Sequence, residues 1–186
     1  MMSFLRSTVR GFIAVIIGTV VLGMAYPCVM WAVSRINADA AEGHLIYDGD
    51  CLVAAHGLAD GRPDDAWFQS RAEGATNLSP LDPQLNKDYE SRRQEIAARE
   101  HVAPEQVPLD AVSGSGSGAD DGISPAYAEL QVPRVARAHG LSEEEVRRLV
   151  SEHTAGRIIG VLGDPVVHVT DLNAALPGGT TCPAVE

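Results

Sequence analysis

Aromatic side chains are scarce in this chain: three Phe, two Trp and four Tyr make up 5% of its 186 residues. A core must therefore rely on Leu, Val, Ile and Ala. Cysteine is scarce as well, and neither a C-x-x-C pair nor an H-E-x-x-H motif occurs, so these metal-binding spacings are missing. No serine stands in a nucleophile-elbow motif, and no lysine follows the Ser-Gly run at 113–118 as it would in a phosphate-binding P-loop. These absences predict a chain without a catalytic or metal site of its own.

Charge is absent from residues 11–34, a run of 24 residues. As a helix this run would be roughly 36 Å long, enough to cross the hydrocarbon core of a bilayer. A cleaved signal peptide is the main alternative, because Arg6 and Arg10 resemble its basic start. The apolar run continues through Trp31, however, beyond the usual length of such a signal. We therefore expect an uncleaved transmembrane helix, with Pro27 inside it as a source of a kink.

Basic and acidic residues are divided unequally along the chain. Residues 1–35 contain three Arg and no acid (+3), and residues 36–186 contain 25 acids against 11 bases (−14), which together give the net charge of −11. The positive-inside rule then predicts a cytoplasmic N-terminus and an extracytoplasmic C-terminal domain. An acidic domain repels phosphate backbones, so nucleic acid is not an expected partner. The expected location is the cell (inner) membrane, crossed once.

Cap residues predict where three helices begin: at Asp82, Ser124 and Ser142. Glu145 follows Ser142 by three positions and completes a capping box. Pro133 is expected to interrupt the helix that begins at Ser124, because proline lacks the N–H that a helix interior needs. On the first helix, opposite charges four residues apart predict two ion pairs on the exposed face, Asp88 with Arg92 and Glu95 with Arg99.

Segments with the sequence pattern of β-strands lie before and after these helices. Residues 45–53 are typical of a hairpin around an Asp-Gly turn, and residues 158–162 and 166–169 are expected to form two closing strands. Strands and helices interleave over about 150 residues, which predicts a single mixed α+β domain behind one transmembrane helix. Outside the span, Cys51 and Cys182 are compatible with a disulfide and equally with two unpaired thiols.

This organisation divides the chain into four parts. We expect a cytoplasmic N-terminus at 1–10, a transmembrane helix at 11–34, an extracytoplasmic domain at 35–176 and a loose tail at 177–186. The tail is called loose because two prolines and two glycines follow Leu176 within it.

Short segments from Arg10 to Leu176 together carry a family resemblance. They are Trp67 to Arg71, Ser115 to Gly118 with Asp120, Ile123 to Pro125, Gln131 to Ala136, Gly140 to Glu143, His153-Thr154, Leu162 to Pro165 and Asp171 to Asn173. Each segment is a weak signal alone, but they occur in a fixed order behind one apolar span. In this order the chain resembles the C subunit of the Kdp potassium-transporting P-type ATPase of bacteria and archaea.

The resemblance implies a non-catalytic accessory subunit of a high-affinity, ATP-driven potassium import complex. Such a subunit is held against a channel-like potassium-binding subunit, beside an ATP-hydrolysing subunit, and stabilises their assembly; membrane lipid surrounds its helix. ATP, Mg and K would be used by that complex, and no cofactor is assigned to this chain. An alternative role that the resemblance implies is a catalytic chaperone, which raises the ATP affinity of the hydrolysing subunit.

The same resemblance supplies candidate partner-interface residues, which are Phe68, Gln69, Arg71, Asn77, Ser115, Gly116, Ser117, Gly118, Gln131, Pro133 and Arg134. By composition alone the Ser-Gly run is a flexible linker. The resemblance implies instead that it is an ordered loop and that Pro133 starts a new helix. For the chaperone role, the ATP-contact candidate is Glu145, at a position where many relatives have Gln. A carboxylate repels a polyphosphate, so we expect Glu145 to serve the capping box.

Overall fold

The computed structural model describes residues 2–59, 62, 64–71, 78–79 and 81–180. Its internal contacts divide the chain into two compact units, Met1–His44 and Leu45–Glu186. Each unit is described by itself below.

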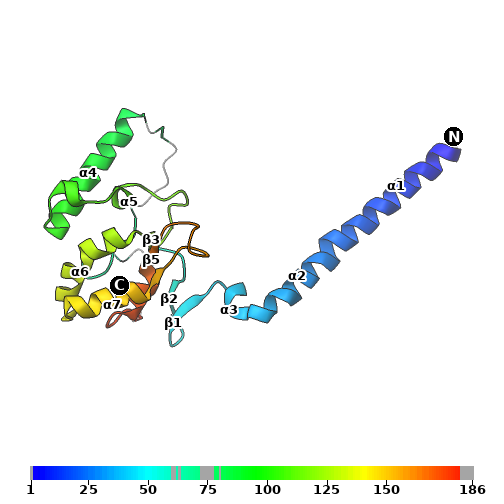
Figure 1. Ribbon diagram of the computed structural model, residues 1–186. Coiled ribbons are helices and arrows are strands. Elements are labelled where there is room, and N and C mark those ends of the chain that lie inside the picture. The colour runs from blue at the N-terminus through cyan, green and yellow to red at the C-terminus, as the bar shows by residue number, and fades with distance from the viewer. Residues whose placement is uncertain (1, 60–61, 63, 72–77, 80, 181–186) are drawn as a thin grey trace. The chain divides into compact units, whose positions relative to one another are not determined.

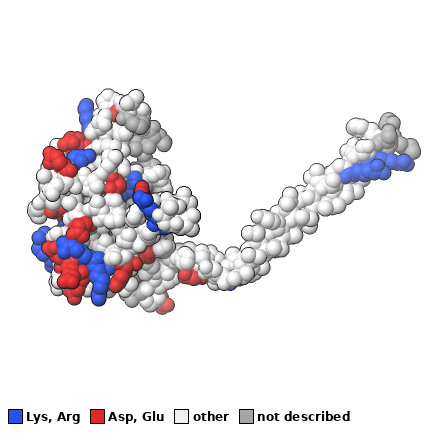
Figure 2. Space-filling model, viewed as in Figure 1, with Lys and Arg blue, Asp and Glu red and all other residues white. Residues whose placement is uncertain are grey.

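The first unit is almost entirely helical (Figure 1). It contains α1 (Met2–Val20), the π-helical turn η1 (Val21–Ala25), α2 (Tyr26–Ser34), the 3-10 turn η2 (Arg35–Asn37) and α3 (Ala38–Ala41). Among the described residues, one helical stretch, Phe4–Ala41, is long and apolar enough to cross a membrane, and its apolar window is entirely unburied. Figure 2 shows this uncharged surface, with basic side chains at its N-terminal end. The apolar helix predicted from the charge-free run is present.

A π-helical turn precedes Pro27 in this helix. Tyr26 donates its backbone N–H to the carbonyl oxygen of Val21, five residues earlier. Proline has no N–H to offer the preceding turn, and a local π adjustment is a known way to accommodate it. The helix therefore continues through Pro27.

The second unit combines short strands with helices that cover them (Figure 1). Its elements are β1 (Leu45–Asp48), β2 (Cys51–Ala55), α4 (Pro83–Glu100), the 3-10 turn η3 (Pro104–Gln106), α5 (Leu109–Val112), β3 (Gly122–Ile123), α6 (Pro125–His139), α7 (Glu143–Glu152), β4 (Thr154–Ala155), β5 (Val166–His168) and α8 (Val169–Ala175). This is the predicted α+β fold.

Two small antiparallel sheets are present in the described residues. β1 and β2 form the predicted hairpin, in which Asp48 pairs with Cys51 across the turn and Gly49 has a φ of 59°. Glycine suits this turn because it adopts positive φ without strain. The second sheet has the order β3-β5-β4, so β5 is central; Ile123 and Thr154 both pair with Val167.

The core of the second unit surrounds α6, which contacts α4, α7 and β5. Its inward side chains, Tyr127, Ala128, Val132, Val135 and Ala136, are at most 2% exposed. Phe68, Val146, Val167 and Leu172 complete the same cluster from other elements. As the sequence required, the core is mainly aliphatic, with Phe68 and Tyr127 as its two fully buried aromatics.

The three predicted caps are confirmed. Asp82 accepts from the N–H of Gln84 at 2.8 Å, Ser124 from that of Tyr127 at 3.1 Å, and Ser142 from that of Glu145 at 3.2 Å. Gly140, with a φ of 66°, ends α6 in the left-handed conformation.

Both expectations for Pro133 are wrong. The residue neither interrupts α6 nor starts a new helix, because α6 runs unbroken from Pro125 to His139. A proline inside a helix costs about 3 kcal/mol or more. Burial of the neighbouring Val132, Val135 and Ala136 offsets this cost, since each of these side chains is at most 2% exposed.

Two further local predictions are also wrong. Residues 158–162 form a tight turn with one isolated bridge between Ile158 and Leu162, whereas the strand that precedes β5 and pairs with it is β4 (Thr154–Ala155). A short continuous apolar run such as residues 158–162 has no periodicity that would distinguish a strand from an apolar turn. On α4, the predicted ion pairs give way to tertiary partners: Arg92 donates to the carbonyl of Val112, and Arg99 donates to the hydroxyl of Tyr127.

The three cysteines have different settings. Cys28 in α2 is a free, exposed thiol, whereas Cys51 in β2 is disulfide-bonded. Cys182 and the end of the expected loose tail, 181–186, lie outside the described residues, while residues 177–180 form turns in which Gly179 is buried.

Candidate functional site

The segment from Trp67 to Arg71 is held by two buried side-chain amides. The N–H of Phe68 donates to Oδ1 of Asn173 at 2.9 Å, and Nδ2 of Asn173 donates to the carbonyl of Phe68 at 3.0 Å. Gln131 repeats this arrangement at the next residue. The N–H of Gln69 donates to Oε1 of Gln131 at 2.7 Å, and Nε2 of Gln131 donates to the carbonyl of Gln69 at 3.0 Å. Each side-chain amide thus bonds to both backbone groups of one residue, as a neighbouring strand would in a sheet. The side chain of Phe68, 1% exposed, anchors the segment in the core.

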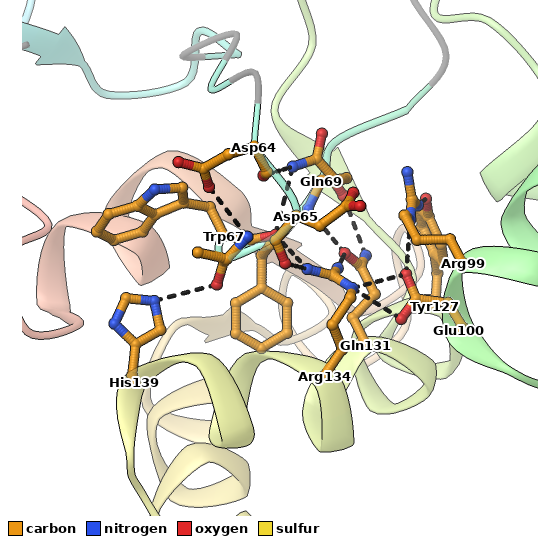
Figure 3. A network of polar contacts seen from close by, with 12 residues as sticks. Asp64, Asp65, Trp67, Gln69, Arg99, Glu100, Tyr127, Gln131, Arg134 and His139 are labelled. Atoms are coloured by element: carbon orange, nitrogen blue, oxygen red, sulfur yellow. Dashed lines mark hydrogen bonds and ion pairs between the residues drawn. The ribbon is translucent and has the colours of Figure 1, made fainter.

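A buried guanidinium supports the same segment (Figure 3). Arg134 donates to the carbonyl of Trp67 at 2.9 Å and to that of Asp65, and its Nη2 donates to Oε1 of Gln131 at 2.8 Å. Its Nε lies 2.9 Å from Oε2 of Glu100, whose side chain is fully buried. Removing one partner of such a pair costs about 3–5 kcal/mol, because the other charge stays buried alone. Arg134 therefore fixes the segment against α6 and α4 together.

The network continues to Arg99 and Tyr127 on the α4 side. Arg99 donates Nε to Glu100 at 2.8 Å and Nη2 to the hydroxyl of Tyr127 at 2.9 Å. Burial raises the pKa of Tyr127, although the charge of Arg99 opposes that shift. Burial alone would lower the pKa of Arg99, but Tyr127 and Glu100 outweigh it, so the pKa is raised. Glu100 therefore accepts hydrogen bonds from two guanidinium groups, those of Arg99 and Arg134.

At the other end of the network, Trp67 packs edge-on against the ring of His139, with the ring centroids 4.7 Å apart. The ring nitrogen Nε2 of His139 lies 3.1 Å from the carbonyl oxygen of Ala66. In Figure 3, Gln131, Arg134 and His139 all extend from α6 toward the segment, so one face of this helix binds the backbone at residues 65, 66, 67 and 69.

Arg71 connects the segment to the Ser-Gly run. Its Nη2 donates to Oγ of Ser113 at 3.0 Å and to the carbonyl of Gly114 at 3.2 Å, and Nη1 lies 3.5 Å from Asp120. Ser115 is 4% exposed and accepts from the N–H of Asp120. The run is therefore an ordered loop, as the resemblance implied, and the linker interpretation is wrong. Of the remaining candidates in it, Ser117 accepts from the N–H of Ala119, Gly118 has a φ of 73°, and Gly116 is exposed.

A cleft of about 660 Å³ opens between the segment and α4. Three arginines line this cleft: Arg71 belongs to the segment, and Arg92 and Arg99 belong to α4. Two acids, Asp65 and Glu95, line it as well. Each of the three guanidinium groups is bonded to the protein: Arg71 and Arg92 donate to carbonyls at 112–114, and Arg99 donates to Glu100 and Tyr127. These arginines therefore hold the walls of the cleft together.

Glu145 lies apart from this network, at the start of α7. Its carboxylate accepts from the N–H of Ser142 at 2.9 Å and from the hydroxyl of Ser142 at 2.7 Å. These two hydrogen bonds lower the pKa of Glu145. The expected capping box is therefore formed.

The structure brings together most of the predicted interface residues. Phe68, Gln69, Arg71, Gln131 and Arg134 share one network, the Ser-Gly loop joins it through Arg71, and Pro133 is half-buried on the same helix. Asn77 lies outside the described residues.

Sequence reasoning missed Glu100, Arg99, Tyr127 and His139 as members of this network. The signal for Glu100 was available, because it follows Ile96 by four positions and so lies on the apolar face of α4, where a charge is unusual.

Comparison with known proteins identifies the family of this chain. Residues 8–177 match the KdpC family, described as K+-transporting ATPase, c chain. A relative from Kineococcus radiotolerans, named potassium-transporting ATPase KdpC subunit, is 40% identical over 185 residues and covers 94% of both chains. A relative of the same name from Burkholderia mallei is 39% identical over 186 residues, covering 92% of this chain and 96% of its own. The match includes the apolar helix and every element of the network, and the chain belongs to the KdpC family of potassium-transporting ATPase subunits.

Proposed function

We propose that this chain is a non-catalytic accessory subunit that stabilises the assembly of a channel-like potassium-binding subunit with an ATP-hydrolysing subunit. One observation carries the proposal: the polar side chains in the family segments are used in internal hydrogen bonds. Gln131 and Asn173 bind backbone, and Arg134 binds backbone and Glu100. Residues engaged in this way build a rigid surface. In this proposal ATP, Mg and K act at the other subunits.

The apolar helix supplies the second part of the proposal. None of its apolar window is covered by the rest of the chain, so its surface is available to lipid and to transmembrane helices of partner subunits. Small residues permit close helix contact, and Gly11 and Gly18 have open space around them. With Arg6 and Arg10 before the span, we propose a cytoplasmic N-terminus and an extracytoplasmic second unit.

The chaperone alternative requires Glu145 to contact ATP. Both of its carboxylate interactions described above go to Ser142, in the same helix cap. A nucleotide would have to compete with them and would meet a negative charge. An extracytoplasmic unit would also be separated from cytoplasmic ATP. We therefore favour the accessory role.

The test is a tagged purification from detergent-solubilised membranes of potassium-starved cells, followed by mass spectrometry and a potassium-stimulated ATPase assay. The tagged chain is expected to bring both partner subunits with it, and the preparation is expected to hydrolyse ATP in response to potassium. A matched variant carries an unrelated apolar helix in place of residues 11–34, and should retain anchoring but lose much of the co-purification. The proposal fails if the two partners assemble and hydrolyse ATP equally well without this chain.

A further inference from the structure

One loop of the second unit exposes four large aliphatic side chains. Ile158, Ile159, Val161 and Leu162 are 71%, 83%, 71% and 59% exposed. They lie in the turn between β4 and β5, beside the β5 label in Figure 1. Single exposed aliphatic residues are ordinary on protein surfaces, but four within five positions form a patch that points to a partner. We refer to residues 158–162 as the apolar loop.

The backbone of the apolar loop is closed on itself. Ile158 and Leu162 exchange both of their backbone hydrogen bonds, at 2.9 and 3.1 Å, and Gly160 and Val161 donate to Arg157 and Ile158. Ile159 has a φ of 48°, a conformation that a β-branched residue rarely adopts. Strain of this kind persists only where the surrounding structure imposes it, and is common at functional positions. The closed turn therefore presents its side chains outward and leaves few backbone donors unused.

These properties favour insertion of the loop into a bilayer over contact with another protein. A lipid environment favours backbone groups that are bonded internally, and four of the five N–H groups of this loop, at 158 and 160–162, are bonded within residues 157–162. Protein interfaces depend more on Trp, Tyr and polar contacts, which residues 158–162 do not offer. The charged residues next to the loop in sequence are Arg157 and Asp164, which pair with each other at 3.2 Å. The loop therefore brings a balanced ion pair toward anionic headgroups, within a part of the chain whose net charge is −14.

The length of the connection makes such contact possible. From Arg35, at the end of the charge-free run, to Leu45, at the start of β1, the chain spans at most about 35 Å. A unit of this size has a radius of gyration of about 14 Å. A bilayer that holds the apolar helix is thus within reach of the surface of the second unit.

We propose that the apolar loop inserts into the headgroup region of the bilayer that anchors the chain, as a second and reversible membrane contact. This inference rests on the proposed anchoring by the apolar helix and adds a lipid-binding site in the second unit. By holding the unit at the membrane surface, the contact would restrict the orientations from which it can meet partner subunits.

The experiment uses the full chain in nanodiscs made of phosphatidylcholine and phosphatidylglycerol. A fluorescent amino acid is placed at Ile159 or, as a matched control, at Leu109, an exposed aliphatic residue of α5 (63% exposed). Lipids spin-labelled near the top of the acyl chain then quench the probe by contact. Quenching at 159 is expected to exceed quenching at 109 by about threefold or more, because interfacial groups insert 5–10 Å.

Two results would overturn the proposal. One is equal quenching at both positions. The other is strong quenching in the lone chain that disappears when the partner subunits are present, since a protein would then cover the loop in the working complex. Flotation with liposomes after an alkaline wash tests the anchoring helix separately, so that a failure of anchoring is distinguished from a failure of the loop to insert.

Discussion

Replacing Gln131 with Met should destabilise the second unit strongly, although methionine matches glutamine closely in length and helix propensity. The substitution removes the bonds to the N–H and carbonyl of Gln69 and to Nη2 of Arg134. Each polar group left unpaired costs 1–3 kcal/mol. Because Gln69 is only half-buried, we take the lower end of that range, which gives a loss of about 3 kcal/mol. For a unit of about 140 residues this corresponds to a Tm lower by roughly 10 °C.

The assay is calorimetric unfolding of the full chain in nanodiscs. Gln94→Met is the matched control, because Gln94 is an exposed glutamine inside α4 whose amide bonds only to Glu90, at 3.1 Å. Its effect should stay within about 0.5 kcal/mol. Equal stability of the two variants would refute the reasoning. If Gln131→Met also abolished co-purification of the partner subunits without changing Tm, Gln131 would be a direct partner contact.

Three further substitutions have expected outcomes. Glu145→Gln retains the bonds to Ser142 and should leave the ATP dependence of the complex unchanged; a lower ATP requirement would favour the chaperone alternative. The pKa of Glu145 is lowered in the folded chain, so its stabilising effect is present above the ordinary value and lost as pH falls through the lowered one, and acid titration of the Gln variant should lack that step. Burial raises the pKa of Tyr127, so stability should fall as pH rises above about 10, and Tyr127→Phe should remove this alkaline loss in a pH series of unfolding curves. Arg71→Met frees the carbonyl of Gly114 and should speed hydrogen exchange at 113–119 by about tenfold, with α6 as the protected internal reference; unchanged exchange would contradict the role given to Arg71.

The side-chain caps at the helix N-termini could be predicted from the sequence. The caps at Asp82, Ser124 and Ser142 depend on residues at most three positions apart, and all three form as expected. Pro133 and the apolar loop were mispredicted because local rules were applied where tertiary packing, or the closure of a turn, decides the conformation.

The polar network was beyond such rules. Gln131 meets Gln69 across 62 positions, and Asn173 meets Phe68 across 105. Nothing in the pattern around any of these residues identifies its partner. The family resemblance singled out most of them, yet only the structure shows that they bind one another.

The pairing of Phe68 with Asn173 also limits how early this unit can fold during synthesis of the chain. Phe68 leaves the ribosome 105 residues before the amide that satisfies its backbone. At 5–20 residues per second this interval lasts roughly 5–20 s. Throughout it, the backbone N–H and carbonyl of Phe68 lack this partner, while the apolar helix has already been made. The second unit can therefore close only near the end of translation, and substitutions at its C-terminal helix α8 would act first on the yield of folded protein.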